Sequence, residues 1–228
     1  MSEEPPAQPI PVEPVPEVVP PKPTLVSQLL RRGRLLAFGF ALAVELTIFF
    51  GAMVYPIPSA QQAQLLNQAN ALMNSTTSQG PAGMFSAIFE NNVRVALLEM
   101  IPAAGAFLFG VSIFTTGQVI QALAISSHLP GPLFGLALFF FPFSIVELSS
   151  YAIAAASGTM LIFAWRRKTL ADEIRVFVLE ALVVVLAVLL AAIMETAGIV
   201  EPLAGLALWL PTALGIAVFA MYLRRRKP

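Results

Sequence analysis

The sequence predicts an all-α protein, a polytopic bundle of transmembrane helices preceded by a disordered, proline-rich N-terminal tail. The chain is 57% hydrophobic and only 11% charged, whereas about 25% of the residues of soluble domains are charged. Several apolar stretches reach the roughly 20 residues that a helix needs to cross a bilayer, and nine prolines fall within residues 1–23. Because so few charges cannot cover a water-facing surface, we expect membrane lipid to be the main surroundings of the fold.

The N-terminal tail contains four glutamates and almost no large apolar side chains besides its prolines. Proline lacks the backbone N–H that helices and sheets require, and its φ is fixed near the polyproline II value. We therefore expect residues 1–30 to form a disordered cytoplasmic tail and residues 31–228 to form the transmembrane domain. Two roles are open for the tail. Its two PxxP spacings could bind a proline-recognition module, or the tail could be a solubilising tether without a specific partner.

The apolar stretches after the tail predict about six membrane helices. A His-Leu-Pro-Gly-Pro cluster at 128–132 interrupts the third stretch, and such a cluster breaks a helix. If residues 114–142 are re-entrant, the number of membrane helices falls to five. The expected helices cover residues 35–55, 84–113, 117–141, 143–165, 174–194 and 203–223.

An uncharged segment, residues 59–84, separates the first two membrane helices. It predicts an amphipathic helix, with Ser59 as its N-cap and an apolar stripe at helical spacing. The stripe consists of Leu65, Leu66, Ala69, Leu72 and Met73. Three placements are open: the bilayer surface, a cover over the bundle, or contact with a partner protein.

The basic residues predict how the chain is oriented. They gather before the first membrane helix, at 166–175, and after the last helix, and only Arg94 lies elsewhere. Lys and Arg are concentrated in cytoplasmic segments. We therefore expect a multi-pass protein of the cell membrane with both termini in the cytoplasm and the amphipathic segment 59–84 outside.

The sequence lacks the residues that several classes of enzyme and metal site require. The chain has no cysteine and one histidine, His128, which excludes a thiol nucleophile and a metal site built from several histidines. HExxH, GxSxG and Walker A motifs are absent, so another chain would have to handle any ATP. We therefore expect no enzymatic activity, no cofactor and no metal. The formal net charge is zero, which gives no reason to expect a nucleic-acid partner.

Ionisable residues inside the apolar segments are the main candidates for function, because each costs roughly 2.5–3.5 kcal/mol to insert at a bilayer centre. Glu90 and Arg94 are one helical turn apart and are expected to pair. We also predict that Arg94 approaches Glu147, or that the two share asparagine partners. The predicted buried polar cluster comprises Glu90, Asn91, Asn92, Arg94, Glu99 and Glu147.

Two interpretations of this cluster are open: a structural cluster that fixes helix pairing, and a transport or proton pathway. Arg94 can neutralise only one or two of the five glutamates embedded in the apolar segments, which are Glu45, Glu90, Glu99, Glu147 and Glu180. The others must be protonated or reach water.

Small residues recur where helices would have to approach closely. Gly, Ala and Ser at such spacing favour helix association in lipid. The candidates for helix packing are Gly105, Gly110, Gly117, Ala154 and Gly158.

Two stretches resemble the stage II sporulation protein M family of integral membrane proteins, over about residues 85–165. The first is Phe-Glu-Asn-Asn-Val-Arg-Val-Ala-Leu-Leu at 89–98, followed by Gly105 and Gly110. The second is Phe-Pro-Phe-Ser-Ile-Val-Glu-Leu-Ser-Ser at 141–150, followed by Ala-Ala-Ala-Ser-Gly at 154–158. The chain has Phe143-Ser144 where the family has His-Gly, Ser149 in place of a proline, and Thr116 in place of an asparagine.

The resemblance implies an all-helical, non-enzymatic membrane body. One expected role is a scaffold that anchors envelope-remodelling enzymes. The alternative is a permease-like subunit of a transporter that uses the Glu/Arg/Asn cluster. The expected partners are therefore membrane lipid and either envelope-remodelling enzymes or transport subunits, with a second copy of the chain as a further candidate.

Overall fold

The computed structural model describes residues 24–225. Within that range the chain forms helices joined by turns, and no strand is present. The predicted tail over residues 1–23 lies outside the described part. The helices are α1 (Leu25–Leu29), α2 (Arg32–Val54), α3 (Ser59–Thr77), α4 (Gly80–Glu99), α5 (Ala104–Ser126), α6 (Gly131–Leu138), α7 (Pro142–Arg166), α8 (Leu170–Val200), α9 (Pro202–Ala207) and α10 (Trp209–Arg225).

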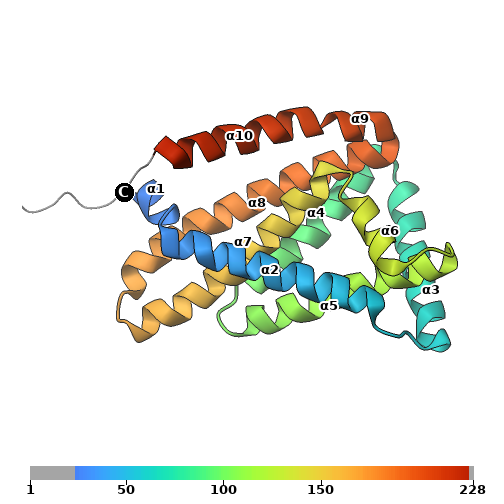
Figure 1. Ribbon diagram of the computed structural model, residues 1–228, viewed down its shortest axis with the longest axis horizontal. Helices are drawn as coiled ribbons and strands as arrows, with labels where there is room; N and C mark the ends of the chain where they lie inside the picture. The colour runs from blue at the N-terminus through green and yellow to red at the C-terminus, as the bar shows by residue number, and fades with distance from the viewer. Residues whose placement is uncertain (1–23, 226–228) are drawn as a thin grey trace, which may run out of the picture.

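The long helices run lengthwise through the molecule, which confirms the predicted all-α bundle (Figure 1). Helix α1, the α7–α8 turn and the end of α10 lie at one end, and α3 and α6 lie at the other. Five helical segments are long and apolar enough to cross a membrane: α2, α5, α7, α8 and the α9–α10 segment Pro202–Arg225. Helix α4 packs among them against α8, α7 and α5, although its polar residues make it less hydrophobic.

The predicted boundary between the second and third membrane helices is wrong. One predicted helix ends at 113 and the next begins at 117, but α5 runs unbroken from Ala104 to Ser126. The break falls instead at 100–103, where Pro102 cannot continue a helix and Ala103 adopts a φ of 65°. The predicted break at Pro130 is correct, and it is followed by the short helix α6.

The described part of the predicted disordered segment 1–30 is not disordered, because residues 25–29 form α1. The prolines stop at Pro23 and Thr24 caps the helix. The Thr24 hydroxyl accepts a hydrogen bond from the Ser27 backbone N–H at 3.2 Å, which satisfies one of the free donors of the first turn.

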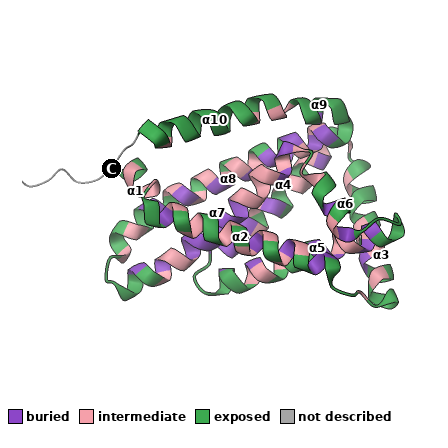
Figure 2. Ribbon diagram, viewed as in Figure 1, coloured by how far each residue is buried: buried purple, intermediate pink, exposed green. Residues whose placement is uncertain are grey.

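Helix α7 is the centre of the bundle. It packs against α8, α2, α4 and α5, and the run 154–158 is buried throughout. Figure 2 shows the buried residues concentrated along α7 and the faces around it, whereas α10 is exposed along its length. Near the start of α10, the Trp209 indole N–H donates to the Phe140 carbonyl at 2.7 Å.

The predicted amphipathic segment forms α3, which begins at Ser59 itself, and Pro58 occupies the N-cap position. Its apolar stripe is divided between two environments. Leu65 is buried against the bundle, where α3 contacts α5 and α4. Leu72 and Met73 are exposed, so only the first part of α3 covers the bundle.

Candidate functional site: a buried acidic cluster

Asn92 and Glu147 join α4 to α7. The Asn92 side-chain amide donates to the Glu147 carboxylate at 2.9 Å, and the Tyr151 hydroxyl donates to the same carboxylate oxygen at 2.8 Å. Asn91 supports the arrangement, because its amide donates to the Asn92 side-chain oxygen at 3.0 Å. The predicted contact between these two spans is therefore made by an asparagine.

Arg94 does not take part in this contact, and the prediction that it approaches Glu147 is wrong. Successive residues of a helix are separated by about 100°, so Arg94 lies roughly 200° around α4 from Asn92. Arg94 and Glu90 are exposed and border a shallow hollow with Val93, Leu97 and Leu98. Within the described residues, they form no ion pair with each other.

The inward face of α4 also carries Glu99, in line with Asn92 and Ala96. Its side chain is 1% exposed, and that of Glu45, on α2, is 0% exposed. Among the described residues, neither carboxyl receives a hydrogen bond on either oxygen. The Glu45 carboxyl lies within electrostatic reach of Glu99 and Glu147. Three acidic side chains from α2, α4 and α7 therefore share one region of the interior.

A fourth acid, Glu195, extends this group from α8. It is partly buried and lies within electrostatic reach of Glu147 and Tyr151. Helix α8 continues to Val200, so Glu195 lies more than one turn inside the helix and not at its end. We call Glu45, Glu99, Glu147, Glu195, Tyr151 and Asn92 the acidic cluster.

Sequence reasoning left Glu45 and Glu195 out of the site, although one signal was available. Glu45 is the only charged residue in the apolar part of α2, and an isolated charge inside a membrane span is a candidate for function. Only the packing of four helices could show that it meets the other acids.

Among the described arginines, the one with a buried guanidinium is Arg34, near the start of α2. Arg34 is 8% exposed and binds two acids of α8, Glu173 and Glu180, each at 2.5 Å. Arg34 thus compensates Glu180, one of the five embedded glutamates that were predicted to depend on Arg94. Glu45, Glu99 and Glu147 have no cationic partner within the described part of the chain.

The acids are spread along the bundle axis. On α2, Glu45 lies about 16 Å beyond Arg34, and on α8, Glu195 lies about 22 Å beyond Glu180. Buried Val184 and Val188 occupy the inward face of α8 between its two acids. Glu45 on α2 and Glu99 on α4 therefore supply carboxyl groups between the Arg34 pair at one end and Glu147 with Glu195 towards the other.

This arrangement suits proton handling better than metal binding. Among the described residues, no three His, Cys, Asp or Glu side chains converge closely enough to hold a metal ion. Separate carboxyl and phenol groups in an apolar interior can each hold or release a proton, and such groups line proton relays in membrane proteins.

Close helix approaches hold the cluster in place at three of the small residues singled out in the sequence. A Cβ added at Gly105 would clash with the Glu99 carbonyl, and one at Gly158 would lie 2.5 Å from the Met100 carbonyl oxygen. Gly117 meets Phe49 and Ala52 of α2 in the same way. Ala154 is fully buried, whereas Gly110 has open space beside it.

Comparison with known proteins agrees with the resemblance noted in the sequence. The family model described as Stage II sporulation protein M matches residues 36–198, which include α4, α7 and every member of the acidic cluster. No curated protein and no solved structure matches the chain. The chain is a multi-pass integral membrane protein that belongs to the stage II sporulation protein M family.

Proposed function

We propose that this protein is a non-enzymatic membrane subunit of a transport system in which the acidic cluster takes up and releases protons. The observation that carries the proposal is the burial of Glu45 and Glu99 without any hydrogen bond or cation among the described residues. A cluster whose only task is packing would be expected to satisfy its polar groups, because an unpaired buried polar group is costly.

The alternative interpretation of the cluster, a purely structural one, accounts for Asn92, Tyr151 and Glu147, which bond to one another. It does not account for Glu45 and Glu99. Protonation would remove the cost of burying their charge, and release of the proton would restore it. A buried carboxyl group without a cation or a hydrogen bond is therefore suited to binding and releasing a proton.

Proton flux through the purified full chain tests the proposal. The protein is reconstituted in phosphatidylcholine vesicles that contain a pH-sensitive dye, and the decay of an imposed pH gradient is followed with the membrane potential clamped. We expect faster decay than in protein-free vesicles, and we expect Glu147→Gln and Glu45→Gln to reduce it. Glu90→Gln is the matched control, because Glu90 is an exposed acid two residues from Asn92.

Two results would refute this function: a wild-type decay no faster than that of protein-free vesicles, or equal decay rates in Glu147→Gln, Glu45→Gln and wild type.

A transport subunit without its own Walker A sequence would also require a partner for any ATP-driven step. Affinity capture of an ATP-binding subunit from native membranes would support the same proposal.

A second candidate function is a scaffold for envelope-remodelling enzymes, and α3 is the observation that favours it. Leu72 and Met73 are 65% and 56% exposed on a helix at the end of the molecule opposite α1. Because α3 is uncharged, it has no electrostatic attraction to anionic lipid, and a protein partner would bury these side chains. In the proposed orientation, with both termini cytoplasmic, this surface faces outward.

A photo-crosslinking residue placed at Leu72 in native membranes tests the scaffold role. Asn70 is the control position, because it is exposed but lies roughly 200° around α3 from Leu72. Crosslinking of an envelope hydrolase at position 72 alone would support the scaffold, and equal products at both positions would contradict it.

A further inference from the structure

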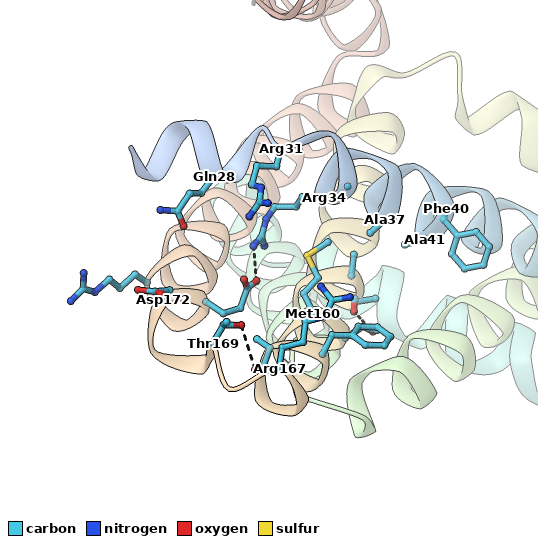
Figure 3. Close-up of a pocket in the computed structure, with 18 of the residues that line it drawn as sticks. Gln28, Arg31, Arg34, Ala37, Phe40, Ala41, Met160, Arg167, Thr169 and Asp172 are labelled. Atoms are coloured by element: carbon cyan, nitrogen blue, oxygen red, sulfur yellow. Dashed lines mark hydrogen bonds and ion pairs between the residues drawn. The ribbon is translucent and has the colours of Figure 1, made fainter. Parts of the chain in front are cut away.

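A hollow in the described structure lies apart from the acidic cluster, at the end that contains α1 and the α7–α8 turn (Figure 3). Its volume is about 1650 Å³, and residues of α1, α2, α5, α7 and α8 line it. Pockets for drug-sized ligands occupy roughly 300–1,000 Å³. This hollow therefore has room for a larger molecule.

Small side chains create the space. Gly33, Ala37 and Ala41 recur at every fourth residue on α2 and line one wall, and Ala155 and Ala156 of α7 line another. Residues four apart lie on the same face of a helix, so α2 turns a continuous small face towards the hollow.

The deeper walls are apolar. Phe40 and Val44 of α2, Phe109 of α5, and Met160 and Phe163 of α7 line this part. Phe40 and Phe163 are 72% and 50% exposed, so the hollow is open to the surroundings of the bundle. In a membrane those surroundings are lipid.

The mouth of the hollow is basic. Arg31, Arg167 and Arg175 line it, together with one acid outside the ion pairs, Asp172. Arg34 and Glu173 also line it but bind each other. Within the described residues, neither Arg31 nor Arg167 forms an ion pair, so both guanidinium groups remain available for an anion.

The distance between the basic mouth and the apolar end matches one leaflet of a bilayer. Arg31 and Val44 are separated by about 20 Å along α2, and the hydrocarbon of one leaflet is roughly 15 Å thick. A molecule with its charged group at Arg31 and its chain beside Val44 would therefore have the dimensions of a membrane lipid.

From these observations we propose that the hollow binds an anionic phospholipid. Its phosphate contacts Arg31 and Arg167, and one acyl chain lies along the wall formed by Phe40, Val44 and Phe109. Arginine suits the phosphate because its planar guanidinium donates two parallel hydrogen bonds. A zwitterionic lipid has the same chains but adds a cation beside this basic mouth, so the site selects the anionic headgroup.

Native mass spectrometry of the full chain in detergent tests the headgroup site, with phosphatidylglycerol and phosphatidylcholine as the two probes. We expect wild type to retain phosphatidylglycerol preferentially. Arg31→Gln with Arg167→Gln should weaken its retention at least about tenfold, since each basic residue near a lipid surface contributes about a factor of five. Arg32→Gln with Arg166→Gln is the matched control, because these exposed neighbours do not line the hollow.

A second pair of variants tests the chain site without changing charge. Ala41→Phe fills the hollow and should release phosphatidylglycerol. Ala43→Phe adds the same ring on an exposed face of α2 that does not line the hollow, and it should retain the lipid.

Three outcomes would overturn the proposal. The first is equal retention of the two lipids by wild type. The second is equal loss in the test and control variants, which would indicate a general surface effect. The third is phosphatidylglycerol binding that appears only after residues 1–23 are removed, which would show that the acidic tail is the occupant.

Discussion

The Asn92 side-chain amide on α4 donates a hydrogen bond to the Glu147 carboxylate on α7 at 2.9 Å, and this bond links the two stretches that carry the family resemblance. Arg94, two residues further along α4, faces away from the contact and is exposed. The contributions of Asn92 and Arg94 to the stability of the bundle can be compared by substituting each in turn.

Replacing Asn92 should destabilise the protein, whereas replacing Arg94 should not. Asn92→Leu removes one of the two donors to Glu147, and we expect the free energy of unfolding to fall by about 1 kcal/mol. Arg94→Leu should change it by no more than about 0.5 kcal/mol, as is usual for surface substitutions. Reversible unfolding in lipid–detergent bicelles measures both, and a larger effect of Arg94→Leu would contradict the assignment.

Breaking the Arg34 ion pair should be among the most damaging single changes. Arg34→Met leaves Glu180 buried without its cation, and removal of one partner of a buried pair costs about 3–5 kcal/mol. Arg32→Met, at an exposed position one half-turn earlier, is the control.

Arg34→Met with Glu180→Met together should recover much of that loss, because no buried charge is then left uncompensated at Glu180. Thermal unfolding of wild type, Arg34→Met, Glu180→Met and the double variant gives the coupling free energy between the two positions. Additive losses from the two single substitutions would show that the pair is not coupled.

Alanine at Gly158 and at Gly110 should have opposite effects. The methyl group that Gly158→Ala adds would lie 2.5 Å from the Met100 carbonyl oxygen. Such overpacking lowers the free energy of unfolding by about 1–3 kcal/mol. Gly110 has open space beside it, so Gly110→Ala should stabilise its helix by up to about 1 kcal/mol. Similar melting temperatures for the two variants would contradict the close approach at Gly158.

The proposed orientation predicts which introduced thiols an impermeant reagent reaches. The natural chain has no cysteine, so a single Ser78→Cys or Lys168→Cys substitution provides the only thiol. We expect a charged maleimide to label position 78 on intact cells and position 168 only after the membrane is opened. Labelling in the reverse order would invert the topology.

The sequence alone determined the class of the molecule. Low charge and long apolar runs leave a chain no stable surface in water, so a membrane bundle follows from composition and periodicity. The break at Pro130 also follows from local chemistry, because the missing N–H of proline acts on its own helix. The family resemblance, carried by the runs at 89–98 and 141–150, is confirmed by the match over residues 36–198.

Only the tertiary structure decided which polar groups meet. The sequence places Arg94 and Asn92 two residues apart, but it does not say which side of α4 faces protein, because both sides carry polar residues. Packing against α7 and α8 turned Asn92 and Glu99 inward. It also brought Glu45 from α2 and Glu195 from α8 to them across more than 40 residues of intervening chain, and made Arg34 the buried guanidinium. Contacts between helices depend on how their faces pack in three dimensions, and the pattern along one chain does not contain that information.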